Sequence, residues 1–147
     1  MLTSSCGWST RAGRRSVPDV LAERRRERER LIDLARDYVQ RLSARLEVEA
    51  AVVAGSVARG DFNVWSDVDV VVITEGLPAR APDRAGLLLA DAPPRVQPVG
   101  FSRAEFVAAL RRRNPLAHEA VERGVVLLGE GLIGSLRVGG NESTSGE

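Results

Sequence analysis

The spacing of hydrophobic residues near the N-terminus predicts a long helix. Pro18 and Asp19 stand at its start, and residues 23–30 are charged at every position. We interpret this charged half as a solvated helix with Arg25 and Glu29 among its i,i+4 pairs; the alternative is a helix that contacts RNA or a partner. In the second half, apolar residues recur every three or four positions, so they share one helix face. The predicted helix covers about residues 19–46, with Leu31, Leu34, Ala35, Tyr38, Val39, Leu42 and Leu46 on that face.

After this helix the pattern changes to that of strands. Apolar residues alternate from Val48 to Ala54 and are followed by Gly55 and Ser56, which predicts a strand that ends in a tight turn. A second run is almost entirely apolar and β-branched, as in a strand buried on both faces. The third contains Pro98, which lacks an amide donor and favours a sheet edge or a bulge. The predicted strands cover about residues 48–54, 68–74, 95–101 and 125–128.

Capping residues indicate three further helices. Asp83 is the predicted cap of the first. Ser102, followed three positions later by Glu105, has the spacing of a capping box. Pro115 suits a first helical turn, and Gly124 suits a helix end. The predicted helices cover about residues 83–90, 102–112 and 115–124.

Helices and short strands alternate along the chain. This order predicts an α/β (α+β) domain with a small mixed sheet of about four strands flanked by helices. A length of 147 residues fits one domain. Residues 1–17 are rich in Ser, Gly and Arg and have no acid, so we expect a disordered leader, with an organellar transit peptide as the alternative. We expect the domain over residues 18–137 and a disordered tail over 138–147.

Composition excludes several classes of protein. The chain is 44% hydrophobic and 28% charged with a net charge of +1, which argues against a wholly disordered chain and against a dedicated nucleic-acid binder. Its apolar runs are far shorter than the ~20 residues of a membrane-spanning helix. One Cys and one His exclude an intrachain disulfide framework and a Cys/His zinc site, so we expect a cytoplasmic protein. All 21 basic residues are Arg, so no lysine chemistry is possible.

Candidate chemistry is concentrated in residues 55–70, GSVARGDFNVWSDVDV. Gly55 allows a sharp turn after the strand, and the backbone amides of a following short helix, with the Ser56 hydroxyl, can bind phosphate. Asp67 and Asp69 project from one face of a strand, where their like charges favour a bound cation. Mg²⁺ binds such oxygen ligands, and nucleotide phosphates complete its coordination shell. This pattern predicts a site for a metal-bound nucleoside triphosphate; a strand cap or surface salt bridge is the alternative for the two acids.

The segment GSVARGDFNVWSDVDVVV resembles the signature of the polymerase-beta-type nucleotidyltransferase superfamily, in its minimal nucleotidyltransferase branch. The later segment VQPVGFSRAEFVAALRRRNPLAHEAVERGVVLLGE resembles the third strand and following helices of small archaeal-type members. The resemblance implies the nucleotidyltransferase fold, Mg²⁺-dependent binding of a nucleoside triphosphate such as ATP, and transfer of a nucleoside monophosphate to a hydroxyl.

By position, the resemblance assigns Gly55 and Ser56 to the phosphates, and Asp67 and Asp69 to the catalytic metal ions. Ser66 is a further candidate nucleotide contact. Two neighbouring residues, Arg59 and Trp65, each have two possible interpretations. Arg59 is a candidate triphosphate ligand or a salt-bridge partner of Asp61. Trp65 is interpreted as a hydrophobic plug, with stacking on a nucleobase as the alternative.

One position departs from the family pattern. Active members carry a third carboxylate on a neighbouring strand, and the matching residue here is Gln97. A neutral amide cannot act as the base and is a weaker Mg²⁺ ligand than a carboxylate. We therefore expect nucleotide binding to survive better than transfer. Asp91 and Glu105 are the alternatives for the missing carboxylate.

Two functions are expected from these observations, one enzymatic and one not, and the sequence does not decide between them. The first is a Mg²⁺-dependent nucleotidyltransferase that moves AMP from ATP to a protein or another hydroxyl acceptor. The alternative is a catalytically degenerate binding protein that acts as antitoxin or scaffold for a helical partner of the HEPN type, which the resemblance implies for minimal members. A homodimer is also considered.

Overall fold

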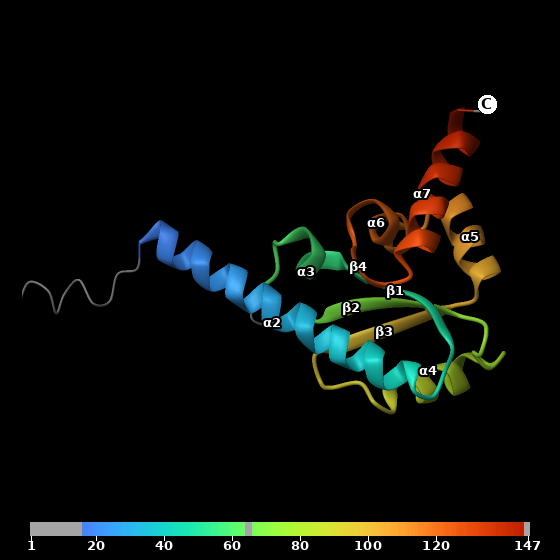
Figure 1. Cartoon of the computed structure of the whole chain (residues 1–147), viewed down its shortest axis with the longest axis horizontal. Coiled ribbons are helices and arrows are strands. Elements are labelled where there is room, and N and C mark those ends of the chain that lie inside the picture. The colour runs from blue at the N-terminus through green and yellow to red at the C-terminus, as the bar shows by residue number, and fades with distance from the viewer. Residues whose placement is uncertain (1–15, 64–65, 146–147) are drawn as a thin grey trace, which may run out of the picture. The chain divides into compact units, whose positions relative to one another are not determined.

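The structure is a computed structural model that describes residues 16–63 and 66–145 (Figure 1). The described residues divide into two units, one up to Arg30 and one from Leu31 onward. Most of the predicted leader, residues 1–15, and the predicted role of Trp65 lie outside the described residues. Within the described residues, no helix combines the length and the apolar character needed to cross a membrane.

Helix α2 spans Val17–Ser43, so it starts two residues earlier and ends three residues earlier than predicted. Its part in the first unit is largely exposed, and Arg30 Nε donates to Glu27 at 3.1 Å. The exposure agrees with a solvated helix, although Arg25 and Glu29 form no ion pair with a described residue.

In the second unit, α2 buries the predicted apolar face. The Tyr38 hydroxyl donates to the Leu88 carbonyl at 2.7 Å and thereby ties the helix to the segment that follows β2. Leu46 lies beyond the end of the helix at Ser43, although its amide donates to the Leu42 carbonyl at 2.9 Å and its side chain packs against the same core. The buried residues of α2 are Leu31, Ile32, Ala35, Tyr38, Val39 and Leu42.

Four strands form one mixed sheet in the order β3-β2-β1-β4. β1 is antiparallel to both β2 and β4, whereas β2 and β3 are parallel. The predicted α/β sheet of about four strands is confirmed, and Pro98 lies on an edge strand as expected. The strands are β1 Val48–Ala54, β2 Val68–Thr74, β3 Val96–Phe101 and β4 Val125–Leu128.

Helices cover both faces of the sheet because its central strands are apolar on both faces. Val53 and Val70 belong to the core that contains the second half of α2, whereas Val52 and Val71 belong to the core beneath α5, α6 and α7. Figure 1 shows these two layers. The remaining helices are α3 Gly55–Arg59, α4 Ala81–Leu89, α5 Arg103–Arg111, α6 Pro115–Arg123 and α7 Glu130–Ser145.

Two predictions about helix ends are wrong. α4 begins before Asp83, which lies in the first turn instead of at the cap, because a proline can occupy a first turn without losing a hydrogen bond. α7 continues to Ser145, so residues 138–145 are helical where a tail was expected. Its first turns bury Ile133 against the sheet, with Leu132 and Leu136 beside it, and this contact anchors the helix.

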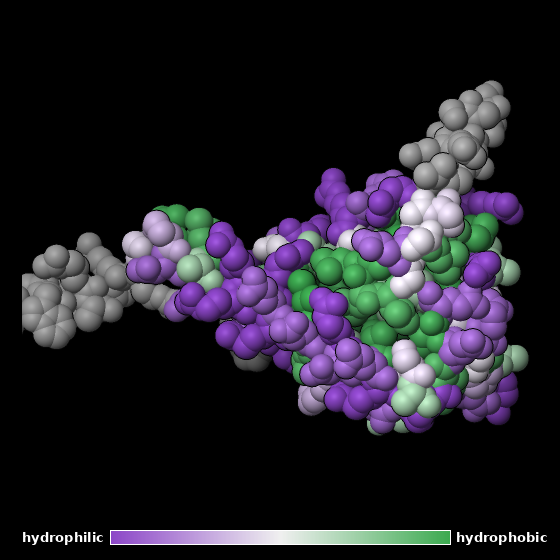
Figure 2. All heavy atoms as spheres, viewed as in Figure 1, coloured by the Kyte–Doolittle hydropathy of each residue, from purple (hydrophilic) through white to green (hydrophobic). Residues whose placement is uncertain are grey.

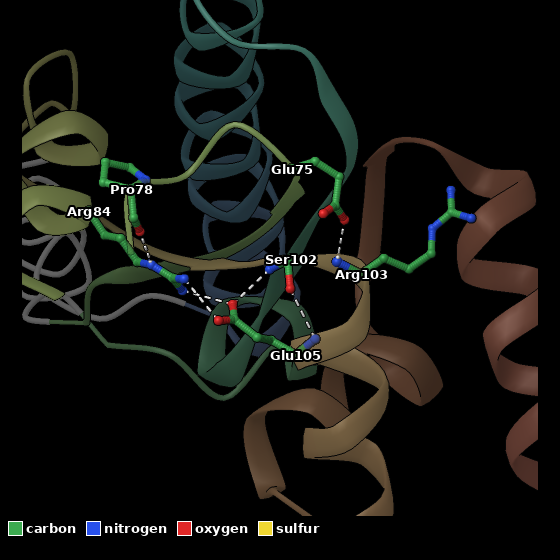
Figure 3. A network of polar contacts seen from close by, with 6 residues as sticks. All are labelled: Glu75, Pro78, Arg84, Ser102, Arg103 and Glu105. Carbon is green, nitrogen blue, oxygen red and sulfur yellow. Dashed lines mark hydrogen bonds and ion pairs between the residues drawn. The ribbon is translucent and has the colours of Figure 1, made fainter. Parts of the chain in front are cut away.

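The predicted caps of α5 and α6 are confirmed, and Figure 3 shows the first of them. Glu105 accepts from the Ser102 amide at 2.9 Å, and its own amide donates to the Ser102 hydroxyl at 3.1 Å. Arg84 of α4 donates two bonds to the Glu105 carboxylate, at 2.7 and 2.8 Å, and one to the Pro78 carbonyl. These donors, Arg84 first and the Ser102 amide second, lower the pKa of Glu105 to about 2. The network joins α4 to α5.

This network predicts a pH-dependent contribution to stability. Because the folded-state pKa of Glu105 lies below its unfolded value, the stabilisation is complete above about pH 4.5 and is lost as the pH falls toward 2. We expect Glu105→Gln to lower the free energy of unfolding by about 1 kcal/mol at pH 7, which is the typical contribution of a helix cap together with a solvent-screened ion pair. Near pH 2 the same substitution should have almost no effect. Urea unfolding across this range measures the difference. Glu47→Gln, at an exposed position, is the control; an equal loss for Glu105→Gln at both pH values would exclude the ionised cap.

Candidate functional site

The turn from β1 into α3 brings Gly55 against Asp69. Ala54 pairs with Asp69 in the β1–β2 register, and Gly55 follows with φ +76°, a left-handed conformation that favours glycine. A methyl group on Gly55 would lie 2.3 Å from Oδ2 of Asp69, well inside contact distance. Only glycine satisfies both the backbone angle and this close approach.

Helix α3 is the short helix expected after Gly55. The preceding residue, Ala54, has no side chain that can cap it. The Ser56 hydroxyl is partly exposed and has no hydrogen-bond partner among the residues that the structure describes. The helix closes at Gly60, whose amide donates to the Ser56 carbonyl at 2.8 Å. The start of α3 therefore faces Asp69 with a free hydroxyl beside it.

Asp67 and Asp69 stand at the entrance to β2. Asp69 is half-buried on the sheet face that carries Val71, and Asp67, two positions earlier, is exposed. Burial raises the pKa of Asp69, and the charges of Asp67 and Glu119 raise it further, while Arg59 opposes them. Neither aspartate forms a hydrogen bond or ion pair within residues 16–63 and 66–145. The two carboxylates therefore form a site whose negative charge the described chain leaves unpaired.

Gln97 lies next to Asp69. The two residues are in register in the parallel β2–β3 pair, so their side chains project from the same face of the sheet. Gln97 is exposed there. The backbone thus places an amide beside the half-buried aspartate, at the position that the family resemblance assigns to a third carboxylate.

The two alternatives for that carboxylate are wrong. Asp91 forms an ion pair with Arg45 at 2.9 Å, near the end of α2. Glu105 caps α5 and pairs with Arg84. Both side chains are therefore engaged in structural contacts that do not include Asp69.

Arg59 is held by two acids at the edge of the site. Its Nε donates to Asp61 at 3.2 Å, which is the salt bridge named as an alternative, and its Nη1 donates to Glu119 of α6. The charge of Glu119 raises the pKa of Asp69, so α6 contributes a negative charge to this site. Sequence analysis missed Glu119 because it lies 50 residues after Asp69 and belongs to no local motif.

Ser66 fixes the loop before Asp67. Its hydroxyl accepts from the Asn63 amide at 2.9 Å, and its carbonyl accepts from Arg95 at 2.7 Å. These bonds give Ser66 a structural role in the loop. Its proposed contact with the nucleotide stays a prediction.

Comparisons with known proteins agree with the fold. A family model described as the nucleotidyltransferase domain matches residues 32–118, a span that contains Gly55, Ser56, Asp67, Asp69 and Gln97 and ends just before Glu119. A proposed nucleotidyltransferase from Sulfolobus solfataricus shares the fold, with a TM-score of 0.55 and 19% identity, over 70% of this chain and 84% of that one. A toxin–antitoxin crystal structure with AMP-PNP has a TM-score of 0.52 and 17% identity, over 75% of this chain and 86% of that one. No match is found among curated proteins. Because the family model covers more than half of its length, the chain belongs to the nucleotidyltransferase domain family.

Proposed function

We propose that the chain binds a nucleoside triphosphate, ATP in the first instance, together with Mg²⁺, and that its transfer activity is weak. The observation that carries this proposal is the unpaired Asp67–Asp69 site next to the start of α3. Gly55 and Ser56 would hold the phosphates, as the family resemblance implies, and the two aspartates would hold the metal.

The donor set fits Mg²⁺. The described residues contain no group of three or more His, Cys, Asp or Glu side chains placed to hold a metal ion. Two carboxylates suffice for Mg²⁺, which keeps several waters and takes further ligands from phosphates. Bound there, Mg²⁺ would neutralise phosphate charge and orient the triphosphate.

The charges around the site support a requirement for the metal. Asp67, Asp69 and Glu119 are negative, and Arg59 is already paired with Glu119 and Asp61. A triphosphate alone would be repelled by this set. We therefore propose that the divalent ion and the nucleotide bind together.

Gln97 limits the reaction that can follow. In transfer, the acceptor hydroxyl attacks the α-phosphorus, the bond to pyrophosphate breaks, and the hydroxyl proton must pass to a base. The amide beside Asp69 cannot accept that proton. Nucleotide binding with little transfer is therefore the function that the geometry supports best.

Transfer of AMP to a protein hydroxyl is the second candidate. Family membership and the intact aspartate pair support it. The likeness to a toxin–antitoxin structure with AMP-PNP supports a protein partner, which we propose to be a helical protein of the HEPN type. In this setting the chain acts as an antitoxin that binds or modifies its partner.

A gain of activity tests the role of Gln97. With ATP labelled at the α-phosphate, Mg²⁺ and the product of the neighbouring gene as acceptor, we expect little label transfer by the natural chain. Gln97→Glu restores a carboxylate beside Asp69 and should raise the rate at least ~100-fold, the lower range for an effective base. Gln97→Ala is the control and should not raise it. Efficient transfer by the natural chain would contradict weak activity and favour the second candidate.

A further inference from the structure

An ion pair between Arg59 and Glu119 joins α3 to α6 at the edge of the candidate site. Nη1 of Arg59 donates to Glu119, and its Nε donates to Asp61 at 3.2 Å. The side chain of Glu119 is 23% exposed, whereas that of Asp61 is 63% exposed, so water screens the second pair more strongly. Both acids raise the pKa of Arg59, Glu119 more than Asp61. Glu119 is therefore the main partner of this guanidinium.

The packing of α6 fixes the position of Glu119. Ala120 and Val121 are buried in the core between the helix and the sheet. Gly124, which follows the helix, lies so close to β1 that an added methyl group would be 2.2 Å from Cγ1 of Val52. Figure 2 shows that the surface over α6, by contrast, is mainly hydrophilic. The helix is thus seated firmly on the sheet and holds a partly exposed carboxylate beside the site.

Arg59 is placed to reach the same ligand as Gly55 and Asp69. It follows Gly55 by four residues in α3, so the two residues lie on one face of the helix, about 5.4 Å apart along its axis. Gly55 is the residue that contacts Asp69. The charges of Arg59 and Glu119 both act on the Asp69 carboxylate, in opposite directions. A cation and the acid that engages it therefore lie next to the proposed triphosphate position.

We infer that Glu119 is a positioning residue that makes nucleotide binding depend on the metal ion, because it engages the guanidinium of Arg59 that would otherwise contact the triphosphate. This role rests on the proposed binding of ATP with Mg²⁺. A guanidinium uses the same N–H groups for a carboxylate and for a phosphate, so Glu119 and the triphosphate compete for Arg59. While Glu119 holds Arg59, the positive charge that the triphosphate requires has to come from the metal ion.

Calorimetric titration of ATP in the presence of a chelator tests this role. Glu119→Gln keeps the size of the side chain and frees the charge of Arg59. ATP binding without metal should then become at least ~10-fold tighter than in the natural chain, the effect of about one hydrogen bond to a charged group. Arg59→Gln breaks the same ion pair but leaves no free cation, so neither this variant nor the double variant should gain such binding. Glu122→Gln removes a more exposed carboxylate from the same helix and is the control.

A purely structural link between α3 and α6 predicts a different result, since loss of the pair would then weaken binding equally in Glu119→Gln and Arg59→Gln. Thermal unfolding verifies that each variant is folded. Glu119→Ala, which also frees Arg59, replaces Glu119→Gln if that variant does not fold.

The inference and the proposed function fail in different ways. If the natural chain binds ATP with Mg²⁺ but Glu119→Gln gains no binding in the chelator, the inference is wrong and the proposed function stands. The same holds if the double variant or Glu122→Gln gains as much as Glu119→Gln. A natural chain that does not bind ATP with Mg²⁺ would overturn both.

Discussion

Gly55→Ala is expected to weaken binding of ATP with Mg²⁺ about 100-fold, the upper range for loss of a group that supports a metal site. The new methyl group would lie 2.3 Å from Oδ2 of Asp69 and would force the carboxylate away from the start of α3. The substitution also strains a backbone with φ +76°, at a cost of about 1–3 kcal/mol of stability. Titration calorimetry measures the binding, and thermal unfolding measures the stability.

Gly60→Ala separates these two effects. Gly60 has φ +90°, so alanine is strained there as well, yet an added methyl group would have nothing within 4 Å. We expect Gly60→Ala to lose stability and to keep nucleotide binding. A folded Gly55→Ala variant that binds ATP as tightly as Gly60→Ala would show that Asp69 takes no part in the site.

Gly129→Ala is expected to cause the largest loss of stability. Gly129 joins β4 to α7 with φ +77°, and an added methyl group would lie 2.2 Å from the Glu49 carbonyl oxygen and 2.8 Å from Cα of Ala50. These are backbone atoms of β1, which cannot move without disturbing the central strand. We expect the free energy of unfolding to fall by at least about 3 kcal/mol and the melting temperature by about 10 °C.

Gly131→Ala, two residues later, is the matched control for this prediction. Gly131 lies in α7, and an added methyl group there meets nothing within 4 Å. Because alanine favours helix over glycine, this variant should gain about 0.5–1 kcal/mol. Urea unfolding compares the two variants, and equal stabilities would mean that Gly129 does not approach β1 as closely as the structure has it.

Local sequence patterns predicted the helices and strands whose formation depends mainly on residues close together in the chain. The β-branched run of β2 and the capping box at Ser102 depend on residues within one element, and both are confirmed. α7 was missed because its apolar residues span little more than one turn and Gly139 and Gly140 follow, both poor helix formers. Arg113 adopts φ +61° after α5, a position where glycine is usual, and no sequence signal marks it.

Residue patterns alone pointed to the candidate site only where its residues are close in sequence. Gly55 and Asp69 belong to one short motif, and the β1–β2 pairing brings them together. The family resemblance indicated Gln97, and the β2–β3 register places this residue beside Asp69. Glu119 reaches the site through the packing of α6, which depends on long-range contacts that residue patterns do not reveal.

Calorimetric titration of ATP into the chain with Mg²⁺ tests the central claim most directly. We predict binding by the natural chain in Mg²⁺, none in the presence of a chelator, and none by an Asp67→Asn, Asp69→Asn double variant. This variant should stay folded, because the raised pKa of Asp69 means that its charge is unfavourable in the folded state. Asp33→Asn, which removes an exposed charge on α2 that has no ion-pair partner among the described residues, is the control and should bind. Absence of binding by the natural chain, or binding that survives loss of both carboxylates, would contradict the account.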